Sequence, residues 1–317
     1  MTPYHEGFEL TAQEHRPLSD YGTKTLRLRV AQGLQVGIGL ASQVMLVQEI
    51  RDKSHGPHGH EEASHASEGQ LGPKMVAKLF DAKYLDPYDH PPSYANRQYV
   101  RETSAYRYLI RHGLGKHIPK FYGSWSTMIA DTQGRQRSVQ LVLAEYIEGM
   151  DMAHLRPADF STEERKDLIR QVLEAETCFY ALDLSHGDLF PRNVIVTETR
   201  RVVIIDFGLA SIGRSACDIY DFEDTDDLLD GRYISPIVRW WRTDHANDEW
   251  ALSGWITWSW NQWLADTWTT DIPDITPAML KWLPYSERQK PFFYFLFHGC
   301  DRTAPNWYVA YKDQTPF

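Results

Sequence analysis

Two short segments carry side chains whose types and spacing suit phosphoryl transfer. In HGDLFPRN, residues 186–193, Asp188 and Asn193 lie five positions apart, and in IDFG, residues 205–208, Asp206 ends an apolar run. Transfer of a phosphoryl group from ATP needs a carboxylate that deprotonates the attacking hydroxyl, and an amide and a second carboxylate that hold magnesium on the phosphates. The three residues supply these groups. Loop capping is the alternative, but it does not explain their joint spacing.

A long helix and a short hairpin are predicted to position these side chains. Ser161 and Glu164 form a capping box, and apolar residues at helical spacing continue from there towards Leu182. The apolar runs at residues 193–198 and 200–206 predict two short strands. The first segment therefore follows a helix, and the second lies at the end of a strand.

The upstream half of the chain predicts strands and one helix. Two β-rich runs surround a glycine-containing turn at residues 25–50, and a further strand is expected at 74–81. An apolar stripe predicts a helix over 93–112, followed by strands at 117–125 and 138–147. Since the chain after about residue 218 favours helices, the order indicates an α+β protein with two lobes.

The run GIGLASQV, residues 37–44, allows a close approach of backbone amides to phosphate, because Gly37 and Gly39 carry no side chain. With the two segments above, it resembles the glycine-rich loop of the protein-kinase-like superfamily, with Ser42 in place of the third glycine. The resemblance implies that Gly37, Gly39 and Val44 contact ATP. A simple hairpin turn is the alternative interpretation of the two glycines.

Two more segments extend the resemblance. The strand MVAK ends at Lys78, which the resemblance places on the α- and β-phosphates with Glu102 as its partner. An ordinary surface ion pair is the alternative for these two residues. The segment LVLAEYIEG resembles the fifth strand and hinge, so backbone groups at Glu145 and Ile147 are expected to meet adenine.

The resemblance covers roughly residues 25–220 and implies a bilobal protein-kinase-like fold. We expect a small β-rich N-lobe over residues 1–144 and a mainly helical C-lobe over 145–317, with ATP between them. The cofactors implied are ATP and Mg2+, and the reaction is transfer of the γ-phosphate to an alcohol group.

The same resemblance gives roles to the residues of the catalytic loop. Asp188 is expected to be the base, Asn193 and Asp206 the metal ligands, and His186 a support for the loop. Arg192 either neutralises the phosphate or the acceptor, or binds the acidic segment that follows.

The subfamily implied by the motifs is intermediate. HGD in place of HRD, and Asp218 ten residues after Gly208, are similar to aminoglycoside and choline phosphotransferases, whereas DFG and the pair RN resemble protein kinases. The acceptor hydroxyl can therefore belong to a protein or to a small molecule. A pseudokinase that binds nucleotide or a partner without turnover is the alternative function, although every metal- and phosphate-binding group is present.

Three biased segments lie outside these motifs. Residues 51–72 are polar and His-rich, which favours a flexible solvated insertion, with zinc or copper binding by its histidines as the alternative. The acidic run 218–230 either attracts a cationic acceptor or is a solvated helix start. Ten of the 11 tryptophans lie at or beyond Trp240, at spacings that favour buried helical faces over stacking on an aromatic or sugar ligand.

Composition excludes several other classes. The chain has 317 residues and a net charge of −10, which disfavours nucleic acid and membrane partners. Its three cysteines form no CxxC pair, and its first residues lack a secretory pattern. We therefore expect a reducing, cytoplasmic location.

Overall fold

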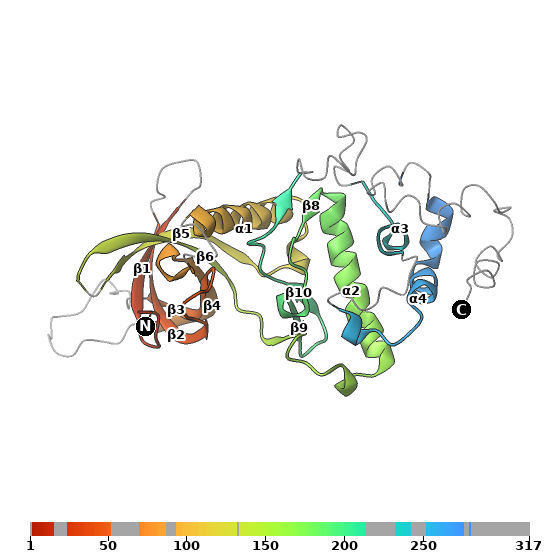
Figure 1. Cartoon of the computed structure of the whole chain (residues 1–317), viewed down its shortest axis with the longest axis horizontal. Helices are drawn as coiled ribbons and strands as arrows, with labels where there is room; N and C mark the ends of the chain where they lie inside the picture. The colour runs from red at the N-terminus through yellow and green to blue at the C-terminus, as the bar shows by residue number, and fades with distance from the viewer. Residues whose placement is uncertain are drawn as a thin grey trace, which may run out of the picture. The chain divides into compact units, whose positions relative to one another are not determined.

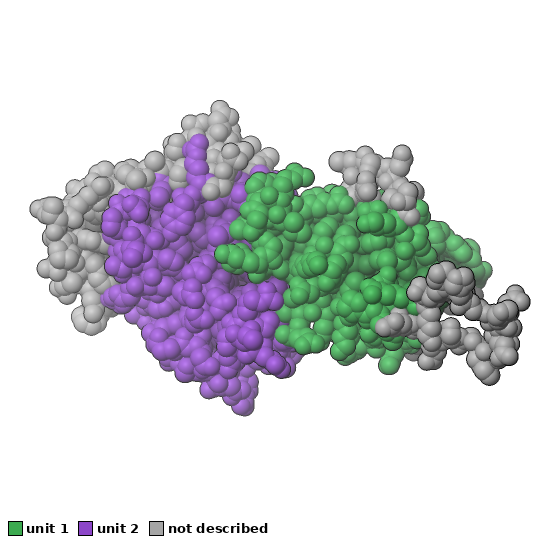
Figure 2. Space-filling view, turned by 180° about the vertical axis from the view of Figure 1, so that it is seen from behind, with its two compact units in different colours: residues 1–148, 206–209 green, residues 149–205, 210–317 purple. Residues whose placement is uncertain are grey.

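The computed structural model describes residues 2–15, 24–51, 70–86, 93–131, 133–213, 232–241, 252–275 and 279 (Figure 1). The chain divides into two units, coloured separately in Figure 2. Unit 1 comprises Met1–Glu148 and Asp206–Leu209, and unit 2 comprises Gly149–Ile205 and Ala210–Phe317. The IDFG segment is therefore split, with Ile205 in unit 2 and the next three residues in unit 1.

Unit 1 contains a closed barrel of six antiparallel strands in the order β1-β2-β3-β4-β6-β5 (Figure 1). Alternate side chains point inward, and Leu28, Met45, Ala77, Leu79 and Leu141 are fully buried in its core. The strands are β1 (Glu9–Glu14), β2 (Thr25–Gln35), β3 (Gln43–Arg51), β4 (Gln70–Phe80), β5 (Phe121–Ala130) and β6 (Gln136–Glu145).

Strands β2 to β6 correspond to the predicted strands, with corrections to their bounds. The strand predicted at 117–125 begins at Phe121 and extends to Ala130, because residues 115–117 form a 3₁₀ turn. The polar insertion is shorter than the predicted 51–72, because Arg51 pairs with Gln70 and Ile50 with Leu71. Strand β4 therefore begins four residues before the predicted 74. Strand β1 was not predicted, since its six residues offer only Leu10 and Ala12 to the core.

The long helix α1 (Ser93–Arg111) follows the short 3₁₀ helix η1 (Ala82–Tyr84) in unit 1 and confirms the predicted helix. It buries Tyr99, Ala105, Tyr106 and Leu109. The polar residues Gln98 and Glu102 are also buried on α1. A further 3₁₀ turn, η2 (Gly115–His117), leads into β5.

Unit 2 is built around α2 (Thr162–Ala181), whose first turn has the predicted capping box between Ser161 and Glu164. The predicted hairpin is also present, as β9 (Val194–Thr197) and β10 (Val202–Ile204), and β7 (Gly149–Asp151) pairs with β9. Gly149 permits this pairing, since a Cβ there would lie 2.5 Å from the carbonyl oxygen of Val196. The remaining elements between residues 149 and 213 are β8 (Leu184–Ser185), β11 (Ser211–Ile212), η3 (Pro157–Asp159) and η4 (Pro191–Asn193).

The described part of unit 2 after residue 231 contains α3 (Pro236–Trp240), η6 (Ser253–Trp255), α4 (Trp260–Thr267) and η7 (Thr269–Asp274). Core packing is confirmed for five of the described tryptophans in this part, whereas Trp240 and Trp258 are only partly buried. The five buried ones are Trp241, Trp255, Trp260, Trp263 and Trp268. The acidic run 218–230 and the four histidines of the insertion lie outside the described residues. In the described part of the chain, no helix is long and apolar enough to span a membrane.

Candidate active site

Lys78 on β4 is held by two carboxylates of unit 1. Its Nζ atom lies 2.6 Å from Glu102 Oε2 and 2.6 Å from Asp206 Oδ1. Lys78 and Glu102 are only 7% and 3% exposed, so the alternative of an ordinary surface ion pair is wrong. The barrel supplies the lysine, α1 supplies the glutamate, and the segment 206–209 supplies the aspartate.

The charges of this cluster depend on one another. Burial alone lowers the pKa of Lys78, but the carboxylates of Asp206 and Glu102 outweigh it and hold the pKa above its ordinary value. Burial raises the pKa of Glu102, and Lys78 opposes this rise. One ammonium group therefore faces two carboxyl groups, whose combined formal charge exceeds that of the lysine.

Asp206 reaches Lys78 through an uncommon backbone conformation, with φ at +65°. The next residue, Phe207, is fully buried and packs edge-to-face on Tyr106, with ring centroids 5.5 Å apart. Gly208 donates its amide to Asp206 Oδ1 at 3.2 Å, and a Cβ at Gly208 would lie 3.3 Å from that same oxygen. Phe207 and Gly208 therefore fix the direction of the Asp206 carboxylate.

The glycine-rich loop joins β2 to β3 and is closed by a residue that the sequence analysis did not single out. The side chain of Gln43 accepts from the Gly37 amide and donates to the Gly37 carbonyl, both at 2.8 Å. The Gly39 amide donates to the Tyr84 carbonyl at 2.8 Å, and φ at Gly39 is +83°, which favours glycine. Val44 pairs with Lys78 in the β3–β4 register.

Three consecutive amides of this loop are available to a ligand. Among the described residues, the N–H groups of Leu40, Ala41 and Ser42 donate to no protein acceptor. Successive free amides in a tight loop are the donors that cradle phosphate oxygens. The amides of residues 40–42 therefore suit a phosphate. The amides of Gly37 and Gly39 do not contribute, because they already donate to Gln43 and to the Tyr84 carbonyl.

The catalytic-loop residues of unit 2 form a second cluster. Asp188 accepts from Arg192 Nη2 through Oδ1 at 2.6 Å and from Asn193 Nδ2 through Oδ2 at 2.8 Å. Asn193 Nδ2 also donates to the Asp188 carbonyl at 2.7 Å. Because Asn193 uses its nitrogen in this way, its amide oxygen has no donor among the described residues and suits a magnesium ligand.

His186 connects this loop to the end of β10. Its Nδ1 accepts the Asp188 amide at 3.2 Å, so Nε2 carries the proton and donates to the Ile205 carbonyl at 3.0 Å. Ile205 in turn donates its amide to the Asn193 carbonyl at 2.9 Å. His186 is buried and therefore orders the backbone that carries Asp188.

Arg192 is half exposed and lies over the ring of Phe190, 4.5 Å from its centroid, while it pairs with Asp188. Of its two expected roles, binding to the acidic run concerns residues outside the described part of the chain. The exposed Phe190 and Arg192 present an aromatic and cationic surface beside Asp188.

The predicted adenine contacts are only partly available. The amide of Glu145 donates to the Lys120 carbonyl at 2.8 Å, so it cannot donate to adenine as well. In the described residues, no protein acceptor receives the amide of Ile147. The expected contact of the Glu145 amide with adenine is therefore wrong, because this amide joins the end of β6 to Lys120, the residue before β5.

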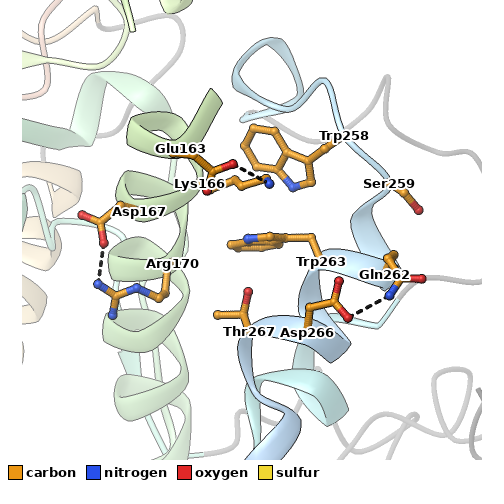
Figure 3. Close-up of a pocket in the computed structure, with 10 residues that line it drawn as sticks. All are labelled: Glu163, Lys166, Asp167, Arg170, Trp258, Ser259, Gln262, Trp263, Asp266 and Thr267. Atoms are coloured by element: carbon orange, nitrogen blue, oxygen red, sulfur yellow. Dashed lines mark hydrogen bonds and ion pairs between the residues drawn. The ribbon is translucent and has the colours of Figure 1, made fainter. Parts of the chain in front are cut away.

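A separate pocket of about 460 Å³ lies between α2 and residues 258–267 (Figure 3). Its lysine and arginine are neutralised on α2 itself, since Lys166 pairs with Glu163 at 2.9 Å and Arg170 with Asp167 at 2.5 Å. Trp263 lies along one wall but is 8% exposed. The pocket contains none of the residues expected to act on ATP.

A comparison with protein families agrees with this geometry. The model of the protein kinase domain matches residues 74–258, which is more than half of the chain, and the chain therefore belongs to this family. Protein kinase domains have a bilobal fold.

Curated relatives carry the same family name. The chain is 33% identical to the serine/threonine-protein kinase cds1 of Schizosaccharomyces pombe over 22% of this chain and 16% of the relative. It is 31% identical to sperm motility kinase 2B of Mus musculus over 33% of this chain and 23% of the relative. It is 29% identical to the probable serine/threonine-protein kinase PknB of Lactococcus lactis over 24% of this chain and 13% of the relative. The match spans less than a quarter of the length of each of these relatives.

Proposed function

We propose that the protein is an ATP- and magnesium-dependent phosphotransferase that moves the γ-phosphate to the hydroxyl group of a protein or a small molecule. The observation that carries this proposal is the buried Lys78, which is held at 2.6 Å by both Glu102 and Asp206. A buried lysine with a purely structural role needs only one carboxylate to balance its charge. Two carboxylates around one ammonium leave negative charge that suits a magnesium ion near the phosphates.

The residues of unit 1 bind and orient the nucleotide in this proposal. Lys78 holds phosphate oxygens, while Glu102 fixes its ammonium group by the 2.6 Å ion pair. The free amides of Leu40, Ala41 and Ser42 donate to the phosphates. The carboxylate of Asp206 is the metal ligand of this unit. Magnesium, when bound, neutralises the charge of the phosphates.

The residues of unit 2 supply the base and a metal ligand. Asp188 accepts the proton of the attacking hydroxyl, with one oxygen oriented by Asn193 and the other by Arg192. The amide oxygen of Asn193 is the second metal ligand. Arg192 donates to Asp188 Oδ1 at 2.6 Å, and this charge-assisted hydrogen bond fixes the direction of the carboxylate.

We place the protein between protein kinases and the HGD-type small-molecule phosphotransferases. The pair Asp188–Asn193 and the DFG segment support the first, and HGD at residues 186–188 supports the second. The named relatives are serine/threonine-protein kinases and a sperm motility kinase, so a protein hydroxyl is the first acceptor to test.

A γ-phosphate transfer assay tests the proposal. The intact protein is incubated with labelled ATP and magnesium against a panel of Ser-, Thr- and Tyr-containing peptides and a panel of small alcohols and amino alcohols. We expect transfer to members of one panel, and transfer reduced by roughly 100-fold or more with Asp188→Asn. Binding of magnesium-ATP without transfer to either panel or to the protein itself would indicate a pseudokinase instead.

A further inference from the structure

Asp81 lies directly after β4 and is among the most strongly bonded side chains of unit 1. It is 3% exposed, and its carboxylate accepts from Arg137 Nη2 at 2.6 Å and from Arg137 Nε at 3.0 Å. It also accepts the amide of Lys83 and so caps the 3₁₀ helix η1. The amide of Tyr84 donates to the Asp81 carbonyl at 3.1 Å. Asp81 therefore determines where η1 lies.

The segment before β1 supplies one more donor to this carboxylate. Tyr4 is 2% exposed, and its hydroxyl donates to Asp81 Oδ2 at 2.5 Å. Its ring packs edge-to-face on Phe8 and on Tyr84, with both pairs of centroids 6.0 Å apart. Burial and the bond to Asp81 raise the pKa of Tyr4, so the phenol remains a donor at neutral pH.

The segment that contains Tyr4 is hydrogen-bonded to the barrel, so the backbone that carries Tyr4 is held in place. The amide of Gly7 donates to the carbonyl of Val30 on β2 at 2.9 Å, and the amide of Val30 donates to the carbonyl of Phe8 at 2.8 Å. The family match begins at residue 74, so the segment lies outside the matched part of the chain.

The other end of the network reaches the glycine-rich loop. The carbonyl of Tyr84 accepts the amide of Gly39 at 2.8 Å. Gly39 immediately precedes Leu40, the first of the three residues with free amides. A displacement of η1 therefore moves the backbone that presents those amides.

We propose that Tyr4 is a positioning residue for the glycine-rich loop, acting through Asp81, η1 and the Tyr84–Gly39 hydrogen bond. The network places the free amides of residues 40–42 before a ligand arrives, which lowers the ordering cost of binding. This inference rests on the proposed function only in naming that ligand as the phosphates of ATP. The mechanical link between Tyr4 and Gly39 stands on contacts within unit 1 alone.

The variant Tyr4→Phe tests the link, because it removes one hydroxyl and leaves the ring packing and the Asp81–Arg137 ion pair in place. The matched control is Tyr99→Phe, which removes another buried hydroxyl of unit 1, bonded to His15 Nδ1 at 2.6 Å. Hydrogen exchange of residues 36–42 is measured in the intact protein without nucleotide. The dissociation constant for magnesium-ATP is then measured for each variant.

We expect Tyr4→Phe to speed exchange of the Gly39 amide by about 5-fold, the equivalent of one hydrogen bond, and to weaken ATP binding by a similar factor. Tyr99→Phe should change neither quantity. Unchanged exchange in Tyr4→Phe, equal changes in the two variants, or tighter ATP binding in Tyr4→Phe would overturn the proposal. If the wild-type protein binds no ATP, the proposed function fails, and the exchange measurement still decides whether Tyr4 holds the loop.

Discussion

At the scale of single residues, Lys78 is the side chain whose surroundings are hardest to explain without a ligand. A buried ammonium needs compensation, and one carboxylate provides it. Here two carboxylates, Glu102 and Asp206, approach the same Nζ atom at 2.6 Å each. The side chain of Asp206 is 43% exposed, so its carboxylate remains accessible to a cation from solvent while it pairs with Lys78.

We expect Lys78→Met to reduce γ-phosphate transfer by roughly 100-fold or more, because the phosphates lose a preorganised positive charge. Stability should also fall by about 3 kcal/mol, since Glu102 is left buried without its partner. Lys74→Met is the matched control on the same strand, where the lysine is exposed over the ring of Tyr146. Rates and thermal unfolding are measured for both variants. Equal rates in the two folded variants would remove Lys78 from the mechanism.

The motif residues were predictable from sequence because most of them are charged residues or glycines at a fixed spacing. Lys78 and Glu102 were expected to pair, and the structure brings them into contact. The contact of Asp206 with Lys78 was not expected, since Asp206 was predicted as a metal ligand. Gln43 was not expected. A neutral amide that closes a turn resembles any polar residue in a strand, and its partner is the backbone of Gly37, which no side-chain pattern reveals.

At the scale of elements, the strongest local signals predicted the elements best. The capping box at Ser161 and the apolar stripe of α1 predicted both long helices within one residue. Strand β1 and the closure of the barrel were missed, because closure depends on the pairing of β1 with β5, whose residues lie more than 100 positions away. The short strand has too few apolar residues for its pattern to predict these contacts.

The cap of α2 gives an element-scale prediction. Ser161→Ala should destabilise the protein by about 1 kcal/mol, because the amide of Glu164 loses its acceptor. Ser259→Ala is the control, since Ser259 is at the N-cap of α4 but makes no capping hydrogen bond. Denaturant unfolding of both variants measures the difference. A cost as large for Ser259→Ala would show that capping is not the cause.

The hairpin of β3 and β4 gives a second prediction. Arg51 pairs directly with Gln70, so a turn of about four residues can replace residues 53–68. The shorter loop should raise stability by about 1 kcal/mol through its smaller closure entropy and leave ATP turnover unchanged. Thermal unfolding with and without added zinc measures the effect. A lower melting temperature in the variant, or stabilisation of only the full-length protein by zinc, would mean that the insertion forms an ordered site.

At the scale of the whole molecule, the chain distributes its chemistry over both units. Unit 1 carries Lys78, Glu102, Asp206 and the glycine-rich loop, and unit 2 carries Asp188 and Asn193. Each half is ordered by contacts within its own unit. In our account, unit 1 supplies most of the nucleotide-binding groups and unit 2 supplies the base, so loss of Asp188 should reduce transfer more than nucleotide binding.

The most direct test of this account compares Asp188→Asn with the wild-type protein. Magnesium-ATP affinity is measured by calorimetry, and transfer is measured with the acceptor found in the panels or, without one, as hydrolysis of ATP. We expect affinity within about 3-fold of wild type and transfer reduced by roughly 100-fold or more, because only the base is lost. Transfer at the wild-type rate would contradict the account, as would a loss of affinity that matches the loss of rate.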